Sequence, residues 1–134
     1  LADLAAANVP AEDILLLSET VLRARIAQHE GDFAQARSEL ERAVTLQDAL
    51  NYTEPPFWYY PVEQTLGAVL LQAGDPEAAI EQFRAALVRH PNNAWSLYGL
   101  MKAQEAAGDE TAGYTSKLLK EAAFDPGAIT IDRL

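Results

Sequence analysis

The sequence contains no cysteine, which excludes disulfide bonds, thiolate metal sites and cysteine nucleophiles. It also has few basic residues, because ten Lys and Arg stand against twenty Asp and Glu and the net charge is −10. Such a chain repels phosphate backbones, so we expect no nucleic-acid partner. No run reaches the roughly 18 uninterrupted apolar residues of a membrane helix, and we expect no direct membrane insertion.

Recognisable catalytic and cofactor motifs are missing as well. His29 and His90 each end a predicted helix, and neither belongs to a cluster with metal-ligand spacing. There is no glycine-rich phosphate loop and no serine in a nucleophile elbow. We therefore expect a protein that is not an enzyme and has no cofactor, metal or catalytic residues.

The composition is that of an ordinary globular protein, with 49% hydrophobic and 22% charged residues in a chain of 134. This length predicts a single domain over residues 1–134. The chain opens at Leu1 without a methionine, which leaves open that it is a fragment. The compartment stays unknown, with the cytoplasm slightly favoured.

Three Gly-Asp pairs, each following a helical apolar run, organise the chain: Gly31-Asp32, Gly74-Asp75 and Gly108-Asp109. The second and third pairs lie 34 residues apart, and the first and second 43. Gly suits the left-handed end of a helix, and Asp caps the next helix through its carboxylate. Repetition at this period is typical of a solenoid of helix hairpins.

Apolar spacing and end signals predict repeats at roughly 11–50, 61–91 and 93–126. Helices are expected over 11–29, from 33 to about 48, after Pro61 to Gly74, from Asp75 to His90, after Asn92-Asn93 to Gly108, and from Asp109 to Asp125. Residues 51–61 form an insertion rich in aromatics and proline. The segment 127–134 is predicted to be an extended tail. It alternates apolar and polar residues without a second strand to pair with, so we interpret it as a cap over the exposed end of the last hairpin.

The stretch from Gly74 to Leu87, closed by Pro91, resembles a tetratricopeptide repeat. The resemblance is carried by the Leu-Gly pair of the first helix and by the small–aromatic–small pattern of the second: Leu66-Gly67, Ala79, Phe83 and Ala86. It implies an all-α fold, a right-handed superhelical solenoid of about three hairpins. The first repeat is similar through Gly31-Asp32-Phe33, whereas the last helix departs from the pattern and resembles a capping element.

In this family the first helix of each hairpin lines a concave groove that binds a peptide or a partner protein. The resemblance places the following residues near the groove: Arg25, Gln28, Gln64, Ala68, Leu71, Trp95, Tyr98, Lys102 and Glu105. Some relatives clamp a peptide carboxylate with clustered basic residues. Arg25 alone is basic at the matching places, so that clamp is not predicted. Trp95 is equally well explained as a core anchor at the start of its helix.

The insertion is a second candidate for partner binding, because five of the eleven aromatic residues fall between Tyr52 and Tyr60. Phe57, Trp58, Tyr59 and Tyr60 offer a large aromatic surface for a peptide. The alternative is that these rings plug the junction between the first two repeats, and we favour it. Insertions that look like this one occur in some bacterial repeat proteins, which suggests a bacterial origin.

The sequence thus predicts a protein–protein interaction scaffold. Two other readings stay open: an accessory region of a larger enzyme or membrane-associated assembly, and a self-association module, for which a homo-oligomer is possible.

Overall fold

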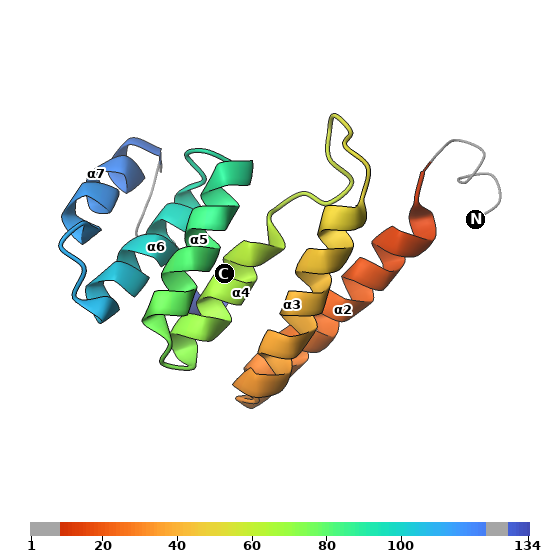
Figure 1. Cartoon of the computed structure of the whole chain (residues 1–134), viewed down its shortest axis with the longest axis horizontal. Coiled ribbons are helices and arrows are strands. Elements are labelled where there is room, and N and C mark those ends of the chain that lie inside the picture. Colours follow the sequence, from red (N-terminus) through yellow and green to blue (C-terminus); the bar gives the residue numbers. More distant parts are fainter. Residues whose placement is uncertain (1–8, 123–128) are drawn as a thin grey trace. The chain divides into compact units, whose positions relative to one another are not determined.

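The computed structural model describes residues 9–122 and 129–134, and within them it is all-helical (Figure 1). The helices are α2 (Ala11–Glu30), α3 (Phe33–Ala49), α4 (Val62–Gln72), α5 (Pro76–Arg89), α6 (Ala94–Ala107) and α7 (Ala112–Ala122), followed by the short 3₁₀ helix η2 (Ile131–Arg133). The described part of the chain contains no strand. The predicted all-α class is confirmed, and the helix pairs α2–α3, α5–α6 and α6–α7 pack against each other as in a helical-repeat solenoid. The predicted end of the last helix at Asp125 and the start of the predicted tail at residue 127 lie outside the described residues.

The chain divides into two compact units, residues 1–62 and 63–134. In the first unit, α2 packs against α3. Their interface joins small and aliphatic side chains that are fully buried: Leu17, Ala24, Ala36, Leu40 and Ala43. Alanine at these positions lets the two helices approach closely, and leucine fills the space that remains.

In the second unit, one aromatic ring joins three helices. The Phe83 side chain of α5 is fully buried, and its ring lies against Gly67 of α4 and Gly99 of α6. A Cβ atom built on Gly67 would lie 2.9 Å from the ring, and one built on Gly99 only 2.2 Å from it. Both helices therefore need glycine at these positions, because any side chain would occupy the space of the ring.

The three Gly-Asp pairs form the same turn. Gly31, Gly74 and Gly108 have φ of 80°, 83° and 70°, the left-handed region in which glycine carries no steric penalty. In each turn the amide of the following Asp donates to a carbonyl five residues earlier, at 2.9 Å (Asp32), 3.0 Å (Asp75) and 2.9 Å (Asp109). This 6→1 bond, together with the bond from the glycine amide to the carbonyl three residues earlier, defines a Schellman motif at the end of each first helix.

The aspartates begin the next helix in two of the three turns. Asp32 accepts from the Gln35 amide at 3.0 Å, and Asp75 accepts from the Ala78 amide at 3.2 Å, as N-caps do. Both helices therefore begin where the sequence predicts.

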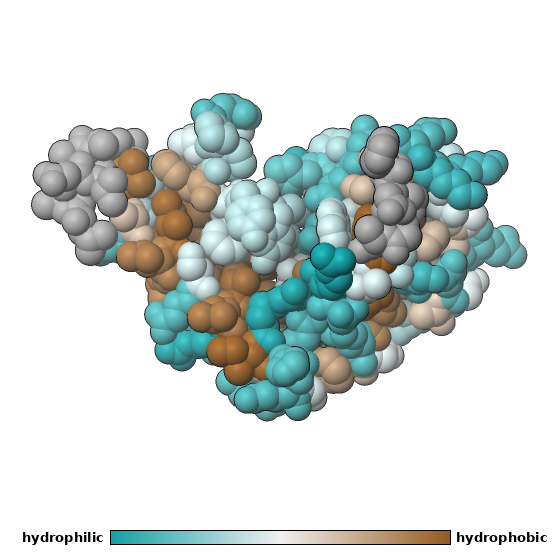
Figure 2. Space-filling model, turned by 180° about the vertical axis from the view of Figure 1, so that it is seen from behind, coloured by the Kyte–Doolittle hydropathy of each residue, from teal (hydrophilic) through white to brown (hydrophobic). Residues whose placement is uncertain are grey.

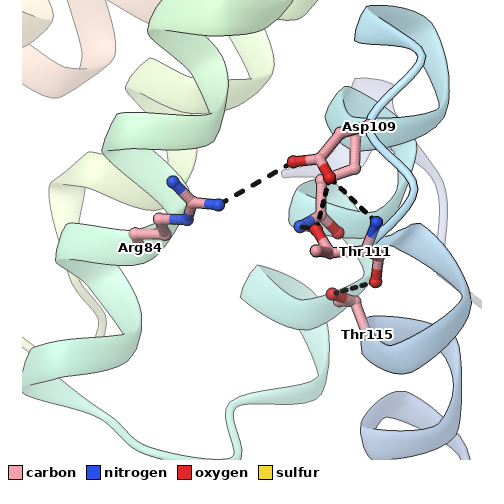
Figure 3. Close-up of polar contacts among 5 residues, drawn as sticks. Arg84, Asp109, Thr111 and Thr115 are labelled. Atoms are coloured by element: carbon pink, nitrogen blue, oxygen red, sulfur yellow. Dashed lines mark hydrogen bonds and ion pairs between the residues drawn. The ribbon is translucent and has the colours of Figure 1, made fainter.

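Asp109 behaves differently, and α7 begins at Ala112 rather than directly after Asp109 as predicted. Its carboxylate accepts from both the amide and the hydroxyl of Thr111, at 2.8 and 2.7 Å (Figure 3). Arg84 of α5 approaches the other carboxylate oxygen at 3.9 Å. The hydrogen bonds from Thr111, more than the Arg84 charge, hold the pKa of Asp109 below its usual value. Because the carboxylate closes a tight turn with Thr111, the helix starts only after that residue.

The segment 129–134, here called the tail segment, also departs from the prediction. It ends in a 3₁₀ turn, and the hydroxyl of Thr65 on α4 donates to the main-chain oxygen of Leu134 at 2.6 Å. In Figure 1 the C mark lies beside α4. The tail segment thus contacts α4, and whether it also caps the last hairpin stays a prediction. Ile129 and Leu134 are buried, and removing these apolar side chains from water accounts for the difference.

We expect Gly99→Ala to lower the free energy of unfolding by about 1–3 kcal/mol, the usual cost of overpacking a dense core. Gly113→Ala is the matched control, because a Cβ there has no neighbour within 4 Å. In a helix this change is neutral or stabilising by up to about 1 kcal/mol. Denaturant unfolding of both variants measures the difference, and equal stabilities would contradict the role given to Phe83.

Candidate functional site

Four of the predicted site residues lie along α6. Asn93 caps the helix, because its side-chain oxygen accepts from the Trp95 and Ser96 amides at 3.0 and 3.3 Å. This cap fixes where the helix that carries the four residues begins. Trp95, Tyr98 and Lys102 are half-buried, and Glu105 is exposed. These residues are three or four positions apart, so they follow one another along one side of the helix.

Electrostatic contacts link the end of this α6 face. Lys102 Nζ lies 2.8 Å from Glu105 Oε2 and 6.0 Å from the centre of the Tyr98 ring. The hydrogen bond to Glu105 raises the pKa of Lys102, against the opposing effect of partial burial. The α6 face therefore presents an aromatic ring, a fixed cation and a carboxylate next to one another.

The predicted residues of α4 are less accessible. Gln64 is 8% exposed, and its side-chain oxygen accepts from the Ser96 hydroxyl at 3.1 Å. This bond connects α4 to α6 inside the second unit. Leu71, one turn before Gly74, is half-buried.

An ion pair that sequence reasoning missed lies next to Gln64. Glu63 is 4% exposed, and its Oε1 lies 2.7 Å from Nε of Arg89 on α5. A carboxylate rarely loses its water without a paired cation and hydrogen bonds. The two residues are 26 positions apart and follow no repeat pattern, so no sequence signal pairs them. The pair ties the start of α4 to the end of α5.

The tail segment lies against the same two helices as these predicted residues. Besides the bond from Thr65, the guanidinium carbon of Arg133 lies 5.8 Å from the centre of the Trp95 ring, within cation–π range. Thr65, Ile129 and Leu134 are 1%, 6% and 2% exposed. The surface predicted for a partner is therefore in part occupied by the chain itself.

In the first unit, Arg25 and Gln28 are half-buried and bonded to each other, at 3.0 Å between Arg25 Nη1 and Gln28 Oε1. The same helix carries an exposed apolar face that was not predicted as a site. Leu15, Leu22 and Ile26 are 59%, 60% and 51% exposed. Figure 2 shows hydrophobic side chains gathered along α2. The sequence signal for this face is the helical spacing of the three apolar residues.

The insertion forms a compact group of rings. Trp58 lies 5.7 Å from Tyr59 and 5.6 Å from Tyr60 between ring centres, and the two tyrosines lie 4.8 Å apart. Phe57, Trp58 and Tyr60 are half-buried, whereas Tyr59 is 81% exposed. The amide oxygen of Gln47 on α3 accepts from the Val62 amide at 2.9 Å and anchors the end of the insertion. The rings thus combine packing with one exposed tyrosine, and the plug and the platform both stay predictions.

Over residues 9–122 and 129–134, no group of three or more His, Cys, Asp or Glu side chains is placed to hold a metal ion. No helix in the same ranges is long and apolar enough to cross a membrane.

A sequence model of the tetratricopeptide-repeat family matches residues 62–112, from the start of α4 to the start of α7. Over these residues the chain is similar to the tetratricopeptide-repeat family, and the resemblance predicted from the sequence is confirmed there. Repeats of this family generally mediate protein–protein interaction. No curated protein and no solved structure gives a significant match. A bacterial origin stays a prediction.

We expect Arg89→Met to lower the free energy of unfolding by about 2 kcal/mol, because it removes the cation that pairs with the buried Glu63 carboxylate. The loss is smaller than for a fully buried pair, because Arg89 is partly exposed and water screens its charge. Arg23→Met is the control, because it breaks a pair with Glu19 that is exposed on both sides. That change should cost less than about 0.5 kcal/mol. Thermal and denaturant unfolding test both, and equal losses would show that the Glu63 pair contributes no more than a surface pair.

Proposed function

We propose that this protein is an interaction scaffold that binds a peptide or a partner protein on the surface of its first helices, with no catalysis of its own. The α6 face is the observation that carries the proposal. Tyr98 supplies aromatic area, and Lys102 and Glu105 supply charges whose geometry is fixed by their mutual contacts. Ordered side chains of this kind lose little entropy when a partner binds.

Contacts within the second unit hold the α6 face in place. Helix α6 is tied to α4 through Gln64 and Ser96, and to α5 through Gly99 and Phe83. Its face is therefore held by the packed core and not by a loop. A preformed surface of this type suits recognition of a segment that is itself flexible.

A random-peptide phage library panned on the intact chain provides the test. Peptides selected in this way should bind Tyr98→Ala about tenfold more weakly in titration calorimetry, because an aromatic anchor of this size contributes about 1–2 kcal/mol. Tyr114→Ala is the matched control, since Tyr114 is an exposed tyrosine on another helix, α7. Selected peptides that bind both variants as well as the parent chain would contradict the assignment to α6.

A second candidate function, self-association, is favoured by the apolar face of α2. Leu15, Leu22 and Ile26 are each more than half exposed, and their spacing places them on one side of the helix. Exposed apolar patches on soluble proteins mark contact surfaces. The same face also suits an accessory region that docks on a larger assembly.

We expect Leu22→Glu to lower the average mass seen by light scattering at high protein concentration, because a carboxylate cannot be buried in an apolar contact without cost. Val88→Glu, at an exposed valine of α5, should leave the mass unchanged. A parent chain that stays monomeric at every concentration would rule out self-association and leave the accessory role.

A further inference from the structure

The tail segment is bound by contacts that do not depend on its being part of the same chain. Thr65 donates to a main-chain oxygen, and such a bond is available to any peptide of suitable shape. Trp95 faces a guanidinium group, and an arginine is preferred over the face of a tryptophan. Ile129 and Leu134 are buried, so aliphatic side chains of the segment are also removed from water in this arrangement.

The alternation of burial along the tail segment separates the side chains that contact the protein from those that do not. Ile129 and Leu134 are buried and Ile131 is half-buried, whereas Thr130 and Asp132 point to solvent. The 3₁₀ turn bonds, from Arg133 N to Thr130 O and from Leu134 N to Ile131 O, fold the segment so that Arg133 lies over the ring while Leu134 is buried. In this one conformation the main-chain hydrogen bonds form, the Arg133 cation lies over the Trp95 ring, and the aliphatic residues Ile129 and Leu134 are buried.

We propose that the surface of Thr65 and Trp95 selects a short segment with the pattern aliphatic–x–aliphatic–x–Arg–aliphatic, and that residues 129–134 occupy it as an intramolecular ligand. A partner segment of the same chemistry binds by displacing them. This inference rests on the proposed function, because it names the kind of partner the scaffold takes. Tethering makes the local concentration of the chain's own segment millimolar, so weak contacts are enough to keep the surface covered.

The test uses the intact chain and a peptide with the sequence Ile-Thr-Ile-Asp-Arg-Leu, labelled with a fluorophore at its amino end and amidated at the other. Ile129→Asp places a carboxylate at a buried position and should release the tail segment. Thr130→Asp adds the same charge at the neighbouring exposed position and should not. We expect the peptide to bind Ile129→Asp about tenfold more tightly than it binds the parent chain or Thr130→Asp. In the latter two, the tail segment covers the surface in most molecules, and the apparent affinity for the peptide falls in proportion to the fraction of molecules whose surface is open.

Equal affinity of the peptide for all three chains, or no binding to any of them, overturns the inference. Circular dichroism shows whether Ile129→Asp keeps its helices. If Ile129→Asp loses its helices, Arg133→Ala is used instead. Arg133 is exposed, so this change removes the contact with Trp95 and the other interactions of the arginine side chain without disturbing a buried position. Binding of the peptide to Arg133→Ala must then be tighter than to the parent chain, and parent-like binding overturns the inference.

Failure of this inference can be told apart from failure of the proposed function. Selected phage peptides that depend on Tyr98 while the tail-derived peptide binds nothing would leave the scaffold function in place and remove only the intramolecular ligand. A tail-derived peptide whose arginine is changed to alanine serves as the specificity control, and it should bind Ile129→Asp more weakly than the original peptide. Equal binding of the two peptides would contradict the role of Trp95.

Discussion

The contact of the Phe83 ring with two glycines is the constraint on which the second unit depends. A buried phenylalanine contributes about 2–3 kcal/mol through the apolar surface it removes from water. Here the ring also sets the distance between α4, α5 and α6, because the backbone at Gly67 and Gly99 approaches it without an intervening side chain. Small changes at this point alter the packing of three helices at once, since protein interiors have no free volume to absorb them.

Polar contacts in the second unit connect the same three helices that the Phe83 ring joins. The Glu63–Arg89 pair joins α4 to α5, and the bond from Ser96 to Gln64 joins α6 to α4. On the other side, the turn closed by Asp109 and Thr111 receives Arg84 from α5 and Gln104 from α6, whose amide nitrogen lies 2.7 Å from the Thr111 hydroxyl. The α6 face, which is the proposed binding surface, is thus supported from several directions.

Local rules predicted most of the helices. Gly-Asp pairs end one helix and begin the next because their turn needs a left-handed residue and a capping carboxylate, and both requirements lie within a few residues of each other. The start of α7 was missed because Asp109 bonds to Thr111, a competing local interaction of the same type. The tetratricopeptide-repeat pattern paired Gly67 with Phe83, and the two residues are in contact in the structure.

The sequence by itself determined the helical repeats, their turns and the residues that can pack closely, because these follow from spacing and from the properties of single residues. Only the tertiary structure decided which distant groups meet. Glu63 pairs with Arg89, and Thr65 bonds to Leu134, although these partners lie far apart in the chain. The exposure of Leu22 likewise depends on which helices pack against α2. The alternation in the tail segment suggested a strand, but in the structure the segment ends in a 3₁₀ turn and its aliphatic residues Ile129 and Leu134 are buried.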